Sequence, residues 1–213
     1  MSKALVISRN ELLKFPREDK GTHMSFVVPA ALLYAQLWLE DRSTCETDDS
    51  VIQILPYMVI KDSVTGKYFS YRRGSKGGEA RLKGKCSIGL GGHLEELPFF
   101  TTYKVVASTI AMGALRELNE EVGIDLTFKN FYDLEEQLLL EKFSLIYSTR
   151  DNVDKYHLCM LIQLEFDARE LTKLEDGVIQ DIAWLSKEEL GDAHWNFSRY
   201  LEGWSDIALT YLK

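Results

Sequence analysis

Apolar and polar residues alternate in blocks along the chain, and these blocks predict its main strands. Residues 51–60 form an almost continuous apolar run, which predicts a strand with Pro56 at an edge or bulge. The turn-forming residues 61–66 follow, and residues 67–73 predict the second arm of a hairpin. Residues 157–166 form another apolar run, which predicts a central strand.

The same pattern predicts further elements toward both ends of the chain. Ser8 and Glu11 have the spacing of a capping box, and Pro29 suits the first turn of a helix. The polar residues 41–50 predict a boundary or a long loop. The remaining predicted elements are a helix from Ser8 to Phe15, a helix over residues 29–40, a strand over residues 137–147, a strand over residues 182–185 followed by a helix capped by Ser186, and a C-terminal helix over residues 195–213.

The most informative helix contains the sequence from Arg116 to Ile124, and Gly123 is placed to end it. Thr101 or Thr102 is placed to cap its start. At about 100° per residue, the carboxylates of this helix crowd onto roughly one turn, where they repel one another. Hard divalent cations prefer such oxygen ligands and commonly hold phosphates as well. The alternative is a solvated face on which Arg116 pairs with Glu120. The three carboxylates are those of Glu117, Glu120 and Glu121.

This segment resembles the signature of the Nudix hydrolase superfamily, with Arg116-Glu117, an aliphatic residue, Glu120-Glu121, Gly123 and a final aliphatic residue. The front half of the signature departs from the family. Ser108 stands where the family has a glutamate, and the nearest preceding glycine is Gly92, which implies an insertion of about ten residues. Glu95 and Glu96 are the candidates to replace the missing carboxylate, if anything does.

The resemblance covers roughly residues 52–190 and implies an α/β (α+β) fold with a mixed sheet packed between helices. It implies three parts, namely an N-terminal extension or helical cap over residues 1–50, a Nudix-like catalytic domain over residues 51–190, and a helical segment packed on it over residues 191–213. The superfamily often forms homodimers, so a homodimer is left open.

The implied reaction is hydrolysis of a nucleoside diphosphate linked to another group, with Mg²⁺ or Mn²⁺ as cofactor. The resemblance implies that Arg116 orients the glutamates and that the carbonyl oxygen of Gly92, or that of Gly91, completes the metal ligands. Glu175 and Asp176 are candidate general bases by their positions alone. The implied metal ligands are Glu117, Glu120, Glu121 and Gly92.

Residues 72–85 carry six cations against the single anion Glu79, and their glycines indicate a loop. Arginine suits bidentate phosphate contacts, and lysine acts as a mobile point charge. Beside three clustered glutamates, this loop predicts contact with the substrate phosphates rather than only a solvated surface. The preferred residues are Arg72, Arg81 and Lys83.

Charge and cysteine content narrow the function classes. A formal net charge of −8 over 213 residues disfavours broad nucleic-acid binding. The three cysteines are widely spaced, which suits a reducing compartment and disfavours a zinc site or disulfide framework. We find no signal pattern and no run of 18 apolar residues, so we expect a soluble, cytoplasmic protein that does not contact membranes.

Two other functions fit parts of the pattern. A non-catalytic Nudix-like module that binds or senses a nucleotide would explain Ser108 and the insertion. An isopentenyl diphosphate isomerase shares the fold and uses a cysteine with metal-binding histidines, but Cys86 and His93 do not have the expected spacing. The sequence does not identify the nucleotide or the group linked to it.

Overall fold

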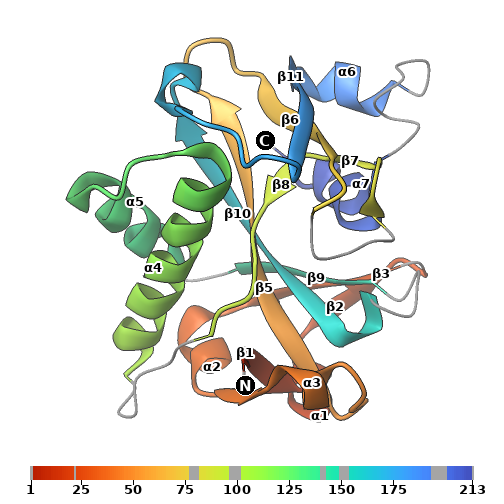
Figure 1. Ribbon diagram of the computed structural model, residues 1–213. Coiled ribbons are helices and arrows are strands. Elements are labelled where there is room, and N and C mark those ends of the chain that lie inside the picture. The colour runs from red at the N-terminus through yellow and green to blue at the C-terminus, as the bar shows by residue number, and fades with distance from the viewer. Residues whose placement is uncertain are drawn as a thin grey trace. The chain divides into compact units, whose positions relative to one another are not determined.

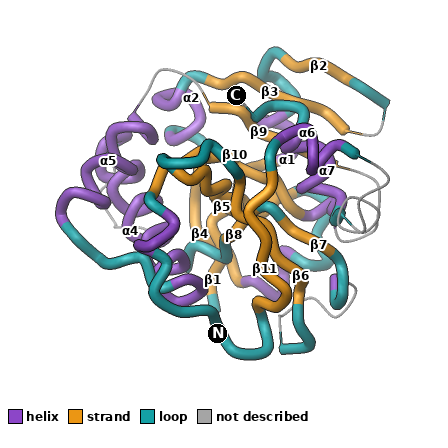
Figure 2. The backbone as a smooth tube through the Cα atoms, turned by 90° about the horizontal axis from the view of Figure 1, so that it is seen from above, coloured by secondary structure: helices purple, strands orange, loops and turns teal. Residues whose placement is uncertain are grey.

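A computed structural model describes residues 2–21, 23–76, 82–95, 102–139, 143–148, 154–192 and 201–212. The chain divides into two compact units. Unit 1 consists of Met1–Tyr57, Gly91–Leu115 and Thr127–Ile162. Unit 2 consists of Met58–Leu90, Arg116–Leu126 and Gln163–Lys213. Figure 1 labels the elements, and Figure 2 colours them by type.

Unit 1 holds most of the N-terminal strands. In one group, β1 pairs with both β4 and the first part of β5, and in another, β10, β9, β3 and β2 pair in that order. The elements that lie wholly in this unit are β1 (Lys3–Ser8), α1 (Arg9–Leu12), β2 (Arg17–Asp19), β3 (His23–Val28), α2 (Ala30–Tyr34), β4 (Leu37–Asp41), α3 (Arg42–Cys45), α5 (Phe128–Leu139), β9 (Phe143–Ser148) and η2 (Asp154–Tyr156).

Unit 2 is built around β6, which pairs with β11, β7 and the end of β5. Strand β8 pairs with the same part of β5. The elements wholly in this unit are β6 (Tyr68–Arg73), β7 (Cys86–Ser87), β8 (Gly89–Leu90), η3 (Ala168–Glu170), β11 (Ile179–Leu185), α6 (Lys187–Gly191) and α7 (Gly203–Leu209). Figures 1 and 2 both show β6 and β11 side by side.

Three long elements contribute to both units, namely β5 (Val51–Asp62), α4 (Tyr103–Val122) and β10 (His157–Phe166). Among the described residues, hydrogen bonding joins 11 strands into one sheet, and the fold is a mixed sheet with helices, as predicted. The apolar runs that predict β5 and β10 are almost wholly buried, which explains their continuous hydrophobicity.

Several predicted elements are confirmed. β6 is the returning arm of the hairpin, and β11 leads into α6 through a capping box of Ser186 and Glu189. Helix α4 ends at Val122, directly before Gly123, as expected. Thr102 Oγ1 accepts a hydrogen bond from the N–H of Val105 at 3.4 Å, whereas Thr101 lies outside the described residues. α7 covers only part of the C-terminal helix expected over residues 195–213.

Other predictions are wrong in part. The helix predicted through Phe15 stops at Leu12, and Ser8 makes no side-chain cap. The helix predicted over residues 29–40 is α2, and the chain then extends into β4. The residues predicted as one strand, 137–147, contain the end of α5 and most of β9. The polar stretch 41–50 contains the short helix α3. No described helix is long and apolar enough to cross a membrane.

Candidate active site

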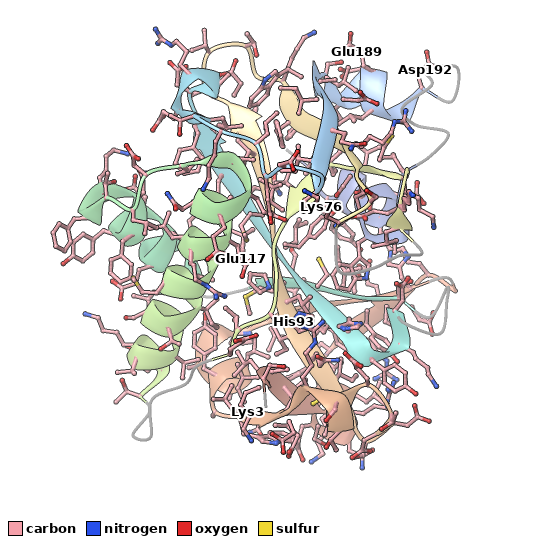
Figure 3. All side chains as sticks on the ribbon, viewed as in Figure 1. Lys3, Lys76, His93, Glu117, Glu189 and Asp192 are labelled. Atoms are coloured by element: carbon pink, nitrogen blue, oxygen red, sulfur yellow. The ribbon has the colours of Figure 1, made fainter. Side chains whose placement is uncertain are left out.

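The last two turns of α4 carry the predicted metal ligands in unit 2. Arg116 Nη2 lies 2.7 Å from Glu117 Oε1, and the Glu117 side chain is only 16% exposed. Glu121 is buried at 7% exposure, whereas Glu120 is exposed. Figure 3 labels Glu117 on α4. Arg116 therefore pairs with Glu117, and this contact differs from the Arg116–Glu120 pair of the solvated-face alternative.

The end of α4 is closed by the segment that runs from Thr172 to Glu175. Gly123 has a φ of +72°, and a Cβ there would lie 2.5 Å from Thr172 Oγ1, so this position requires glycine. Thr172 Oγ1 donates to the carbonyl oxygen of Gly123 at 2.7 Å. The N–H of Lys173 donates to Val122 at 3.4 Å, and that of Glu175 donates to Glu121 at 2.8 Å. One segment thus satisfies the carbonyl groups at the helix end.

This pairing places the backbone of Glu175 beside the backbone of Glu121. The Glu175 side chain is exposed. Glu175 was selected as a general base from its sequence position alone. Its backbone N–H is hydrogen-bonded to the carbonyl oxygen of Glu121, the last of the three predicted carboxylate ligands on α4.

The basic loop is held by its own contacts in unit 2. Arg72 Nε lies 3.2 Å from Asp181 Oδ2, and Arg72 Nη1 donates to the carbonyl oxygen of Gly84 at 2.8 Å. Lys83 is exposed, whereas Arg81 lies outside the described residues. Lys76, labelled in Figure 3, pairs with Asp176 at 2.6 Å. Arg72 and Lys83 thus remain predicted phosphate ligands, and Arg72 already engages a carboxylate.

Ser108, which departs from the family signature, lies within α4 and contacts a different carboxylate. Its hydroxyl donates to Oε1 of Glu135, a buried residue of α5. Glu117 lies nine positions after Ser108 on the same helix, so their side chains leave it about 180° apart. Of the two candidate replacements, Glu95 is exposed, and Glu96 lies outside the described residues.

A buried polar network in unit 2 was not predicted from the sequence. Glu202 is 3% exposed and accepts hydrogen bonds from Arg73 and Ser87. Tyr71 is fully buried, and its hydroxyl donates to the carbonyl oxygen of Gly89 at 3.0 Å. Burial raises the pKa of Tyr71, and the charges of Glu121 and Glu202 raise it further against the opposing effect of Arg73. Arg73 belongs to the cationic stretch, but the sequence carried no signal that pairs it with Glu202.

The donor chemistry at the end of α4 fits a hard divalent cation. Carboxylates as enclosed as those of Glu117 and Glu121 require positive charge or hydrogen-bond donors around them. In the part of the chain that the structure describes, no three acidic, histidine or cysteine side chains are gathered closely enough to hold a metal as they stand. Gly92 is half-buried in the loop after β8 and remains a predicted ligand.

The residues considered for isomerase chemistry are poorly suited to it. Cys86 is fully buried, and burial raises the pKa of its thiol, which disfavours the reactive thiolate. Burial, together with the charge of Arg42 and the neighbouring His157, lowers the pKa of His93 to about 3. Cys86 therefore fits the role of a buried core residue.

Comparison with a solved structure establishes the fold. The crystal structure of Tm1382, a protein assigned provisionally as a Nudix hydrolase, matches this chain with a TM-score of 0.66. The match covers 98% of this chain and 97% of that one at 24% sequence identity. The chain therefore shares the fold of that structure, in agreement with the Nudix-like fold that the segment around Arg116 predicts.

Among curated proteins, Protein YmaB of Bacillus subtilis (strain 168) is 27% identical over 172 residues. These residues are 81% of this chain and 76% of YmaB. No family model matches the chain.

Proposed function

We propose that the protein is a metal-dependent hydrolase that cleaves the pyrophosphate bond of a nucleoside diphosphate linked to another group. Water adds across the bridging P–O bond, and the products are a nucleoside monophosphate and the phosphorylated second group. The observation that carries the proposal is the carboxylate cluster at the end of α4, in which Glu121 is buried and Arg116 holds Glu117.

Each proposed site residue has a role that follows from its position. Glu117, Glu120 and Glu121, with the Gly92 carbonyl oxygen, would hold Mg²⁺ or Mn²⁺, whose charge neutralises the diphosphate and lowers the pKa of a bound water. Arg116 keeps the Glu117 carboxylate in place by its 2.7 Å contact. Glu175 accepts the proton of the attacking water, since its backbone is fixed beside Glu121.

The basic loop binds the substrate phosphates. Arg72 exchanges its contact with the exposed Asp181 carboxylate for a phosphate, and Lys83 adds a mobile charge. The Gly84 carbonyl oxygen keeps the Arg72 guanidinium oriented during this exchange. Arg81 completes the predicted set.

A binding or sensor module is the second candidate. The observation that favours it is that the described carboxylates are not gathered into a three-residue metal group. Such a module would retain its nucleotide affinity when the charge of Glu120 is removed.

A hydrolysis assay separates the two functions. Nucleoside diphosphate derivatives are incubated with Mg²⁺ or Mn²⁺, and an added phosphatase releases phosphate from the monophosphate products. We expect Glu120→Gln to lower kcat roughly 100-fold, because several kcal/mol of charge stabilisation are lost. Glu136→Gln, which changes an exposed glutamate of α5, is the matched control and should retain full activity. Nucleotide binding without turnover in the wild type would instead establish the sensor.

A further inference from the structure

Glu202, the residue that precedes α7, is a buried anion held by a bidentate arginine. Arg73 Nε donates to Glu202 Oε2 at 2.5 Å, and Arg73 Nη2 donates to Oε1 at 3.2 Å. Glu202 is 3% exposed, so the pair carries a large desolvation cost. Such a pair persists when further hydrogen bonds satisfy the carboxylate, and two serines of unit 2 supply them.

These two serines connect Glu202 to consecutive backbone amides. The hydroxyl groups of Ser87 and Ser205 lie 2.7 and 3.4 Å from Glu202 Oε1. Ser205 Oγ accepts from the N–H of Ile88 at 3.1 Å, and Ser87 Oγ accepts from the N–H of Gly89 at 3.2 Å. Because each hydroxyl has one proton, donation to the charged carboxylate orients its lone pairs toward the amide.

The same short segment is fixed from its other side as well. The N–H of Glu202 donates to the carbonyl oxygen of Cys86 at 2.9 Å, and Tyr71 donates to that of Gly89 at 3.0 Å. Both backbone polar groups of Gly89 are therefore held by side chains. Gly89 and Leu90 form β8, and the chain continues directly into Gly91 and Gly92.

We propose that Glu202 is a positioning residue for the carboxylate site, because its hydrogen-bond network fixes residues 86–89, from which the chain continues to the predicted metal ligand Gly92. The proposal rests on the proposed function, since it assigns Glu202 to the metal site of that reaction. The influence of the Glu121 charge on the pKa of Tyr71 supports the closeness of this network to the end of α4.

The test replaces the ion pair without leaving a buried charge. Arg73→Met combined with Glu202→Met keeps apolar volume, and such replacements of buried pairs commonly preserve folding. Mn²⁺ binding to the substrate-free protein is followed by electron paramagnetic resonance, and kcat and KM are measured alongside. We expect Mn²⁺ affinity and kcat each to fall roughly 10- to 100-fold, with KM little changed. Losses of this size are typical when a residue that orients a metal ligand is replaced.

Two further variants keep the test decisive. Lys61→Met with Glu165→Met removes an exposed pair of the same unit and should leave both readouts unchanged. Ser205→Ala removes one link without touching a charge, and it should shift Mn²⁺ affinity in the same direction by a smaller factor. If the double variant fails to fold, Ser205→Ala alone decides the proposal.

The outcomes separate this proposal from the proposed function. A folded double variant with unchanged Mn²⁺ affinity and kcat would overturn the role of Glu202 while leaving the hydrolase intact. A wild type that binds Mn²⁺ without hydrolysing any substrate would refute the hydrolase, and the Mn²⁺ shift would still decide the role of Glu202. A wild type that does neither would overturn both.

Discussion

Two glutamates, Glu121 and Glu135, are buried to nearly the same extent, at 7% and 8% exposure, yet their surroundings differ. Glu121 lies on α4 one turn after Glu117 and beside Glu120, so it belongs to a cluster of like charges. Glu135 lies on α5 and accepts a hydrogen bond from Ser108. Figures 1 and 2 show α5 next to α4.

A buried carboxylate alone therefore does not define an active site. Glu135 has the neutral hydroxyl of Ser108 as a hydrogen-bond donor, and buried polar groups usually have at least one such partner. The cluster around Glu121 combines several carboxylates with the guanidinium of Arg116, an arrangement that raises electrostatic repulsion unless a cation offsets it. We therefore expect Glu121 to act in the chemistry and Glu135 to act in packing.

The largest expected difference is in turnover. Glu121→Gln should lower kcat by roughly 100-fold or more, because one carboxylate charge is lost from the cluster. Glu135→Gln keeps the shape of the side chain and should leave kcat within about threefold of the wild type. The measurement is the coupled phosphate assay on both purified variants. Equal losses of kcat in the two variants would show that Glu121 and Glu135 do not differ in function.

Restoration of the family glutamate at position 108 should harm rather than help. Ser108→Glu would place a second carboxylate against the buried Glu135, with a cost of about 2–4 kcal/mol in the free energy of unfolding. Urea denaturation measures this cost. Ser108→Ala is the control, with a loss of about 1–2 kcal/mol from one unmade hydrogen bond. A rise in kcat of Ser108→Glu would show that position 108 reaches the site after all.

A smaller loss of stability is expected at the end of α4. Gly123→Ala forces a positive φ on a residue with a Cβ and crowds Thr172 and Lys173, which should cost about 1–3 kcal/mol. Gly191→Ala is the matched control, since no atom lies within 4 Å of its added Cβ. Chemical denaturation of both variants checks the prediction. Equal stability of the two variants would mean that the segment from Thr172 to Glu175 moves to accommodate the added Cβ at little cost in free energy.

The smallest effect is stabilisation by the metal itself. At a Mn²⁺ concentration ten times Kd, the wild type and Glu135→Gln should each gain about 1.4 kcal/mol in the free energy of unfolding. Glu121→Gln should gain much less at the same concentration. Urea denaturation with and without Mn²⁺ measures the gain, and an equal gain in all three proteins would place the metal elsewhere.

The sequence predicted helix α4 and its end better than the course of the chain around it. The spacing of Arg116, Glu117, Glu120 and Glu121 is local, so one helix suffices to bring them together. Strands β5 and β10 were also predictable, because continuous burial requires continuous hydrophobicity.

Helix α5 was missed because its polarity is inverted at several positions. Asn130 and Glu135 are buried, whereas Phe128 is 83% exposed and Tyr132 is also exposed. A prediction that assumes apolar residues to be buried and polar residues to be exposed cannot identify such a helix. The apolar residues after it span the end of α5 and the start of β9, so they resemble one strand.

Glu202 could not be assigned for a different reason. Its partners Arg73, Ser87 and Ser205 come from three separate stretches, and only the folded chain brings them together. The role of Ser108 likewise depended on a residue of α5, 27 positions away. Contacts at such sequence distances leave no periodic signal.

The segment after η3 has a consequence for how far the chain tolerates changes of length. Thr172, Lys173 and Glu175 each supply a donor to one of three successive carbonyl groups at the end of α4. Just beyond them, the carbonyl oxygens of Gly177 and Val178 accept from the N–H groups of Lys76 and Gly74. Removal of a single residue between Thr172 and Glu175 would shift every later donor and acceptor out of step with its partner. Relatives that keep this geometry should therefore conserve the number of residues here more strictly than their identity.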